Sequence, residues 1–111
     1  MFHHQRLRCF QVAMEVARRV PSLIARWPRG HAYLEDQLKR AVASVSLNIV
    51  EGNQRTGPKE RARFFAIARG SAAESAAAID LAVAYRLMNA EEGDELKDLL
   101  LQVVKMLSKL K

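Results

Sequence analysis

A chain of 111 residues is long enough for one hydrophobic core, so the sequence predicts a single domain over residues 1–111, and its apolar, Ala- and Leu-rich composition favours an all-α fold. The net charge of +6 is uneven, since residues 1–70 hold thirteen basic and five acidic side chains; this favours a nucleic-acid partner over a membrane, with an ordinary solvated surface as the alternative. No apolar run approaches the roughly 20 residues of a membrane span, the N-terminus lacks a signal-peptide core, and the single cysteine, Cys9, fits a reducing cytoplasm, so we expect neither membrane insertion nor secretion.

The first helix is predicted over residues 5–27. Pro21 removes a backbone donor and crowds the preceding turn, so we expect a kink there or a break with a restart. Pro28 disfavours helix at Trp27 and Gly30 supplies a flexible turn, so this segment should end the helix. Two neighbouring apolar lines at helical spacing form a broad core face: Leu7, Phe10, Met14 and Ala17, and beside them Cys9, Ala13, Val16 and Val20.

The second helix is predicted over residues 32–55 and has two usable faces. Its apolar line steps by three or four residues through Leu34, Leu38, Ala41, Val45 and Ile49. A polar stripe follows the same steps through Gln37, Arg40, Ser44, Asn48, Glu51 and Arg55. Because Ser and Asn are poorer helix formers than Glu or Lys, we interpret this stripe as semi-buried between helices; a solvated polar face is the alternative.

The third and fourth helices follow after short connections. The third is predicted over residues 58–88, with Thr56 or Gly57 as its cap and proline in its first turn, and small residues around Gly70 should let another helix approach closely. Asn89 and Glu92 form a capping box that starts the fourth helix, predicted over residues 90–110. Four amphipathic helices with short connections indicate an antiparallel up-and-down four-helix bundle.

The turn at Gly57 also predicts which charged residues meet. Arg40 and Glu74 each lie seventeen residues from this turn, and Glu51 and Arg63 each lie six residues from it, so both pairs should sit at matching heights on adjacent helices. We expect Arg40 and Glu74 to lie within salt-bridge reach, either inside one subunit or across a subunit boundary. If such a pair is partly buried, it contributes more to specificity than to stability.

Catalytic and metal sites find little support in the sequence. The three histidines lie outside the helix interiors: His3, His4 and His31. The Glu-x-x-His motifs of a di-iron bundle are therefore absent, and one cysteine without paired spacing cannot complete a zinc site. Arg26 and the histidine five residues later match the Arg-x-x-x-x-His motif of helical ribonuclease toxins, but Pro28 and Gly30 interrupt the helix that this motif requires. We expect no enzyme, metal or cofactor, with the ribonuclease as the least favoured alternative.

Three motifs resemble the signature of the four-helix-bundle proteins encoded by 23S rRNA intervening sequences. They read Q-L-K-R-A at 37–41, S-V-S-L-N-I-V-E-G at 44–52 and F-F-A-I-A-R-G-S-A-A-E at 64–74, and the resemblance covers nearly the whole chain. The family pattern is Q-L-[RK]-R-A, S-[IV]-x-x-N-I-x-E-G and F-x-x-A-x-G-S-x-x-E. The motif and associated structural residues in this chain are Gln37, Arg40, Asn48, Glu51, Gly52, Arg63, Gly70, Ser71 and Glu74.

The resemblance implies a homopentamer, in which the bundles form a ring around a central channel. A relative in the same family, the accessory variability protein of diversity-generating retroelements, binds a reverse transcriptase and nucleic acid through a basic surface. The resemblance therefore implies nucleic acid or a protein such as a reverse transcriptase as partners, although the family has no settled biochemical function. Pro21 and Val50 depart from the family pattern, and the fold should tolerate both.

These observations predict a non-enzymatic, oligomeric protein that binds the phosphates of RNA or DNA. The candidate contacts are basic residues of the first seventy positions: Arg6, Arg18, Arg19, Arg26, Arg29, Arg55, Lys59, Arg61 and Arg69. Aromatic residues are few and mostly in core positions, so base stacking should contribute little. A protein–protein adaptor or scaffold ring with no nucleic-acid role is the main alternative.

Overall fold

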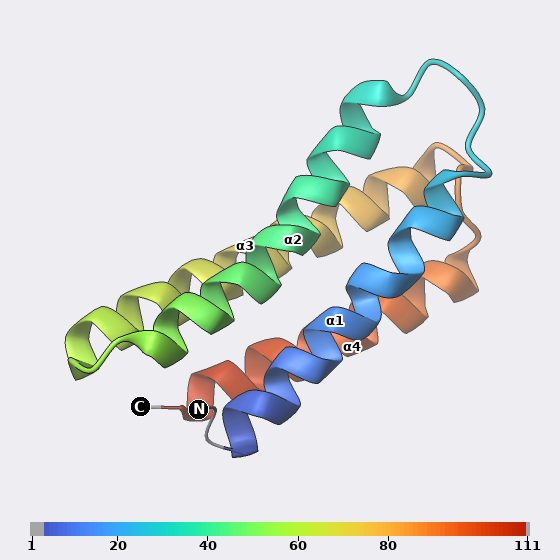
Figure 1. Ribbon diagram of the computed structural model, residues 1–111. Helices are drawn as coiled ribbons and strands as arrows, with labels where there is room; N and C mark the ends of the chain where they lie inside the picture. Colours follow the sequence, from blue (N-terminus) through green and yellow to red (C-terminus); the bar gives the residue numbers. More distant parts are fainter. Residues whose placement is uncertain (1–3, 111) are drawn as a thin grey trace.

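Four helices make up the structure. The computed structural model describes residues 4–110, in which the chain forms α1 (His4–Ile24), α2 (Ala32–Gln54), α3 (Pro58–Ala84) and α4 (Ala90–Lys109) (Figure 1). Both α1 and α3 pack against α2 and α4. The fold is therefore an all-α helical bundle, as the sequence predicts. None of the helices described here is long and apolar enough to cross a membrane.

The bundle is elongated, with extents of 45 × 23 × 19 Å. Figure 1 shows the α2–α3 turn at one end, together with the start of α1 and the end of α4. The α1–α2 loop and the α3–α4 turn lie at the other end. We refer to these as the α2–α3 end and the α1–α2 end, because the two ends carry different side chains.

The core consists of one row of apolar side chains from each helix. On α1 the buried row is the second of the two expected lines and extends to Ile24, whereas Leu7 of the first line is exposed. The expected apolar line of α2 is buried along its whole length, from Leu34 to Ile49. Phe65 of α3 and Val103 of α4 complete the centre of the core. The helical spacing therefore identifies the buried lines of α1 and α2, and of the first α1 line Phe10 and Ala17 pack partly buried against the core whereas Leu7 does not.

Local sequence signals set most of the helix boundaries. The capping box at the start of α4 is present in both directions, since Asn89 Oδ1 accepts from the Glu92 backbone N–H and Glu92 Oε1 accepts from the Asn89 N–H. Gly57 is the N-cap of α3 without a side-chain hydrogen bond, and Pro58 stands in the first turn, as expected. Gly30 adopts φ +102°, the left-handed conformation that glycine tolerates best.

The first helix corrects two expectations. It continues through Pro21, so the expected break with a restart is wrong while the kink stays a prediction, and the backbone N–H of Ala25 donates to the Pro21 carbonyl oxygen at 3.0 Å. The helix then ends at Ile24, three residues earlier than predicted, because Trp27 folds back and its N–H donates to the Ile24 carbonyl oxygen at 2.9 Å. The indole of Trp27 is buried there, so the residue belongs to the core beyond the helix.

The third helix ends at Ala84, four residues before the predicted end. Arg86 adopts φ 61°, and the backbone N–H groups of Arg86 and Leu87 donate to the carbonyl oxygens of Val83 and Ala82. These two bonds form a Schellman motif, in which a residue in the left-handed conformation terminates the helix. Arginine at a position that usually holds glycine gives no sequence signal for such an end.

Close helix contacts lie at glycines other than Gly70. A Cβ atom at Gly70 would meet no atom within 4 Å, so Gly70 itself makes no close approach within the subunit, whereas its small neighbours Ser71 and Ala72 are buried and Ser71 contacts Ser44 of α2. Instead, a Cβ at Gly52 would lie 2.5 Å from Cε1 of Phe65, and a Cβ at Gly93 would lie 2.8 Å from Cγ2 of Val83. The absent side chains let α2 approach α3, and α4 approach α3.

Candidate nucleic-acid interface

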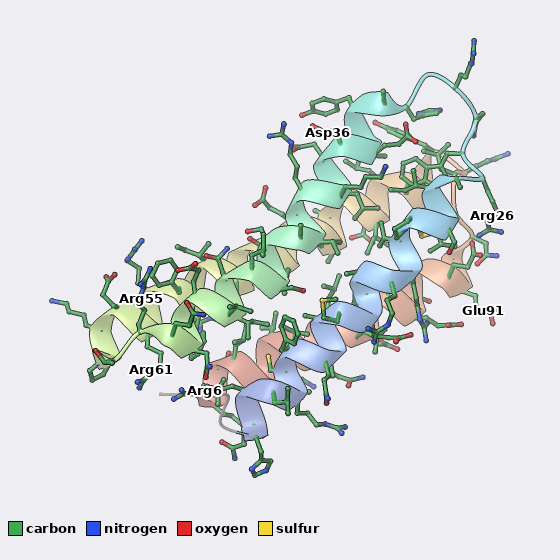
Figure 2. All side chains as sticks on the ribbon, in the orientation of Figure 1. Arg6, Arg26, Asp36, Arg55, Arg61 and Glu91 are labelled. Carbon is green, nitrogen blue, oxygen red and sulfur yellow. The ribbon has the colours of Figure 1, made fainter. Side chains whose placement is uncertain are left out.

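Basic side chains from three helices meet at the α2–α3 end. Arg6 comes from the start of α1, Arg55 directly follows α2, and Lys59, Arg61 and Arg63 lie in the first turns of α3. Figure 2 shows Arg6, Arg55 and Arg61 together at this end of the molecule. We name these five residues the basic end. Four of these five residues are predicted contacts. Arg55, Lys59 and Arg61 lie on either side of the α2–α3 turn, and Arg6 lies near the start of α1.

Arg6 is held in place by neutral groups. Its Nη1 donates to Oδ1 of Asn53 at 3.2 Å, and its guanidinium lies 5.9 Å from the ring centroid of Phe65. Burial, and next the positive charge of Arg61, lower the pKa of the Arg6 guanidinium. No carboxylate of residues 4–110 lies within ion-pair distance of Arg6, so its charge is available to a ligand.

Arg61 fastens the α2–α3 turn. Its Nη2 donates to the carbonyl oxygens of Arg55 and Thr56 at 3.1 and 3.4 Å. The guanidinium therefore satisfies carbonyl groups at the end of α2 that have no partner within the helix. Both of these acceptors are neutral, and they fix the position of the cation at the turn.

Two further cations enclose the ring of Phe64. The Cζ atoms of Arg55 and Arg63 lie 4.8 and 4.4 Å from its centroid. Arg55 also pairs with Glu51 at 2.8 Å, and Arg63 pairs with Glu60 at 3.0 Å. The expected pairing of Glu51 with Arg63 is therefore wrong, because each side chain finds a partner within its own helical segment. The Arg63 hydrogen bond lowers the pKa of the Glu60 carboxyl group.

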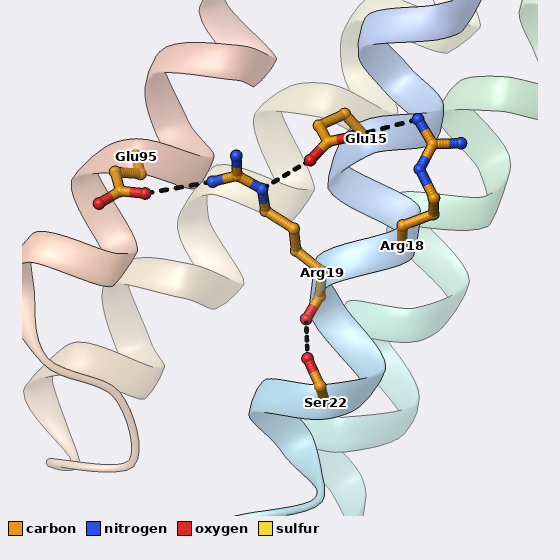
Figure 3. Close-up of polar contacts among 5 residues, drawn as sticks. All are labelled: Glu15, Arg18, Arg19, Ser22 and Glu95. Carbon is orange, nitrogen blue, oxygen red and sulfur yellow. Dashed lines mark hydrogen bonds and ion pairs between the residues drawn. The ribbon is translucent and has the colours of Figure 1, made fainter.

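Two other predicted contacts, Arg18 and Arg19, are paired with acidic partners. Figure 3 shows Arg18 and Arg19 bound to the Glu15 carboxylate at 3.1 and 2.9 Å, and Arg19 also reaches Glu95 of α4 at 3.1 Å. Hydrogen bonds from Arg19 and then Arg18 lower the pKa of Glu15. Because these pairs are exposed to solvent, they contribute little to the stability of the fold. Their main consequence is to remove net positive charge from this part of α1.

The remaining candidates lie away from the basic end. Arg26 is bound to Glu92 at the α1–α2 end. Arg29 lies in the loop that follows α1, and Arg69 lies on α3 eleven residues beyond Pro58. The structure thus brings together Arg6, Arg55, Lys59 and Arg61 of the nine predicted residues, and separates them from the other five.

The middle of the polar stripe on α2 faces α3, as predicted. Ser44 Oγ and Ser71 Oγ are 2.7 Å apart, and Asn48 Nδ2 donates to both the carbonyl oxygen and Oγ of Ser44 at 2.8 and 3.0 Å. On α3, Ser75 Oγ donates to the Ser71 carbonyl oxygen at 2.8 Å. The Ser44–Ser71 contact joins α2 to α3, whereas Asn48 bonds within α2 and Ser75 bonds within α3. The end of the stripe at Gln37 is exposed, so the semi-buried interpretation holds only for its middle.

Arg40 does not pair with Glu74 inside the subunit. Its Nε instead binds Oδ2 of Asp36, one turn earlier on α2, at 3.0 Å. Glu74 lies with Gln37 along a shallow groove of about 210 Å³ between α2 and α3, whose rim includes the exposed Tyr33. Counting residues from the turn at Gly57 places Arg40 and Glu74 at matching heights along α2 and α3. Such a count does not show which face of its helix each residue occupies.

The two residues of the ribonuclease motif have different partners in the structure. Arg26 contacts Glu92, whereas the His31 ring packs 6.2 Å from the ring of Tyr85, so the two residues of the ribonuclease motif do not act together. Neither residue lies in a helix, as Pro28 and Gly30 predicted. No group of three metal-ligating side chains occurs within residues 4–110, and His3 lies outside them.

The expectation that aromatic residues are mostly internal is wrong for both tyrosines. Tyr33 is 78% exposed and Tyr85 is 57% exposed. Tyr85 lies at helical spacing from Ala78 and Ala82, but α3 ends just before it. For Tyr33 a signal was present, because it falls on neither of the two lines of α2.

Comparisons with known proteins agree with this fold. The family model described as 23S rRNA-intervening sequence protein matches residues 5–109. A crystal structure of a protein of unknown function from the S23 ribosomal protein family of Bacteroides thetaiotaomicron VPI-5482 superimposes with a TM-score of 0.85. The two chains are 18% identical, and the match covers 94% of this chain and 95% of that one. No curated protein matches the sequence.

Proposed function

Because the chain belongs to the 23S rRNA-intervening sequence protein family, we propose that it is a non-enzymatic, oligomeric protein whose basic end binds the phosphates of RNA or DNA. The observation that carries this proposal is the gathering of five cationic side chains from three helices against two carboxylates, those of Glu51 and Glu60. Arg6 and Lys59 form no ion pair with any described residue, so the basic end carries an excess of positive charge. A cluster of this kind attracts a polyanion.

The chemistry of the basic end favours phosphate over base recognition. Arginine presents a planar fork of donors that matches two phosphate oxygens, and four of the five residues are arginines. Contacts to phosphate position a nucleic acid without reading its sequence. Binding should therefore show little sequence preference and should weaken steeply with salt, because each neutralised phosphate releases counterions.

We further propose that the antiparallel bundle is the subunit of a ring-shaped homopentamer. Exposed apolar side chains support this, since Leu47 of α2 and Ile67 and Leu81 of α3 face outward, with Gly70 and Ala77 between them on α3. Small residues permit a neighbouring helix to pack closely. Five copies would repeat the basic end around the ring, and several weak contacts would then act together. A light-scattering mass of one 12.5 kDa subunit at micromolar concentration would contradict the assembly.

Charge reversal tests the proposed binding. Fluorescence anisotropy with a structured RNA and a duplex DNA at low salt should show binding by the wild-type protein. The Arg55→Glu, Arg61→Glu variant should lose most of that binding in both nucleic acids. The control is Arg18→Glu, Lys39→Glu, which makes the same change in net charge away from the basic end and should retain most of the affinity.

A third variant separates charge from folding. Arg61 bonds to the turn, so its replacement affects local structure, whereas Lys59→Glu alters an exposed side chain that forms no ion pair within residues 4–110. Helical content by circular dichroism should be unchanged in Lys59→Glu, and its affinity should fall. If the wild-type protein binds neither nucleic acid at low salt, the proposal fails.

A scaffold ring that docks a protein partner is the second candidate. The exposed apolar side chains on α2 and α3 favour it, because such a surface binds proteins more readily than it binds a polyanion. A partner retained after nuclease digestion in a pull-down supports this alternative.

The single cysteine, buried and without a disulfide, suits the reducing cytosol, where we place the protein.

A further inference from the structure

The basic end contains two kinds of cation. Arg55, Lys59 and Arg63 are exposed, and neighbouring carboxylates bind the first and the last of them. Arg6 and Arg61 are only partly exposed, and the Nε atom of each is buried. The basic end therefore has an exposed set of three cations and a recessed pair. We name Arg6 and Arg61 the arginine pair.

Both members of the arginine pair are held against the α2–α3 turn. Nη1 of Arg6 donates to Oδ1 of Asn53 at 3.2 Å. Nη2 of Arg61 donates to the carbonyl oxygens of Arg55 and Thr56 at 3.1 and 3.4 Å. The two guanidinium groups therefore bind the same short segment of chain, and Figure 2 shows both side chains at this corner of the bundle.

The arginine pair concentrates positive charge in a partly buried place. Burial, and next the charge of Arg61, lower the pKa of the Arg6 guanidinium. The Asn53 amide that binds Arg6 is neutral, and Nε of Arg6 has no hydrogen-bond partner within residues 4–110. The ring of Phe65 covers one face of the same guanidinium. An anion with more than one negative charge suits this arrangement best, because it relieves the repulsion between both cations at once.

The terminal phosphate of a nucleic-acid strand is such an anion. A phosphate monoester carries about −1.5 to −2 near pH 7 and three strong acceptor oxygens, whereas each internal phosphodiester carries a single negative charge. A planar guanidinium binds two phosphate oxygens at once, so two guanidinium groups can share the oxygens of one monoester. A monoester also ends its strand, so it can enter a recessed position that a continuous backbone cannot follow.

We propose that Arg6 and Arg61 form a site for the terminal phosphate of a nucleic-acid strand, while the exposed cations of the basic end bind its internal phosphates. The inference rests on the proposed function and adds a preference for phosphorylated ends of RNA or DNA. The 5′ and 3′ termini can both carry a phosphate monoester, so the experiment tests each terminus separately.

The experiment compares three forms of one DNA hairpin. The hairpin carries a dye in its loop and has a 5′-phosphate, a 3′-phosphate, or hydroxyl groups at both termini. Its affinity for the protein is measured by fluorescence anisotropy at low salt. Arg6→Gln removes one charge from the arginine pair, and Lys59→Gln is the matched control that removes one charge from the exposed set. Circular dichroism of both variants checks that the helical content is unchanged.

Wild type should bind at least one phosphorylated form about fivefold or more tightly than the hydroxyl form. Arg6→Gln should bind the three forms with similar affinity, whereas Lys59→Gln should bind all three more weakly and keep the preference. Equal wild-type affinity for the three forms overturns the inference, and the proposed function then stands because the hydroxyl form is still bound. A preference that survives in Arg6→Gln, or that Lys59→Gln abolishes, also overturns the inference. Absence of wild-type binding to every form removes the proposed function as well.

Discussion

Replacing Gly52 by alanine tests the contact between α2 and α3 that supports the basic end. A Cβ atom at this position would lie 2.5 and 2.7 Å from Cε1 and Cδ1 of Phe65, and 3.3 Å from the Arg61 carbonyl oxygen. Ordinary carbon contacts are about 3.5–4.0 Å, so the overlap is roughly 1 Å. Phe65 is 1% exposed and has the Arg6 guanidinium over its ring, so the ring has little room to retreat.

Two opposing effects decide whether Gly52→Ala raises or lowers the free energy of unfolding. Alanine favours a helix over glycine by about 0.5–1 kcal/mol, and less near a helix end such as this one. Forcing a methyl group into a well-packed core costs about 1–3 kcal/mol. We therefore expect Gly52→Ala to lower the free energy of unfolding by about 0.5–2 kcal/mol, which lowers Tm by roughly 3–12 °C in a domain of this size.

A double-mutant cycle shows whether the contact with Phe65 causes the loss of stability in Gly52→Ala. Thermal and urea unfolding are measured for wild type, Gly52→Ala, Phe65→Leu and the double variant. In the Phe65→Leu background the ring is absent, so Gly52→Ala should be neutral or stabilising. If Gly52→Ala is as stable as wild type, or equally destabilising in both backgrounds, the assigned contact is wrong.

Three other predictions concern single residues. Arg86→Gly should raise the free energy of unfolding by about 1 kcal/mol in thermal unfolding, because glycine adopts the left-handed conformation without strain; an unchanged Tm would contradict this. Burial raises the pKa of the Cys9 thiol to about 12, so labelling by a thiol reagent at pH 8 should be slow until the protein unfolds, and rapid labelling of the folded protein would refute it. The Arg26 hydrogen bond lowers the pKa of Glu92, so its stabilisation is present above the ordinary pKa of about 4.3 and is lost as the pH falls through the lowered value. The acid loss of Tm between pH 7 and pH 3 should therefore be smaller in Arg26→Gln than in wild type, and an equal loss in the two proteins would contradict the assignment.

Features that depend on a few neighbouring residues could be predicted from the sequence. The capping box of Asn89 and Glu92 and the proline at the start of α3 are local signals, and both are present. The buried line of α2 follows from helical spacing alone. These elements need no knowledge of how the helices pack, which is why sequence reasoning identifies them.

Features that depend on the rotation of one helix against another could not be predicted. Residue counting placed Arg40 opposite Glu74, but a helix also turns about 100° per residue, and the nearer Asp36 binds Arg40 instead. For the same reason, sequence reasoning expects the close helix contact at Gly70, whereas the structure has it at Gly52. Sequence alone also could not distinguish Arg19 from Arg6. Acidic side chains of two helices bind Arg19, whereas Asn53 and the Phe65 ring, the partners of Arg6 among the described residues, are neutral.

The salt dependence of binding tests the central claim most directly, because it counts phosphate contacts. The affinity for duplex DNA is measured by anisotropy over a series of salt concentrations for wild type, Lys59→Gln, Arg61→Gln and Arg18→Gln. Each variant of the basic end should make the log–log slope shallower by about 0.9, the value for one lost contact, whereas Arg18→Gln should leave it unchanged. Equal slopes in all four proteins, or a loss with Arg18→Gln as large as with Lys59→Gln, would contradict phosphate binding at the basic end.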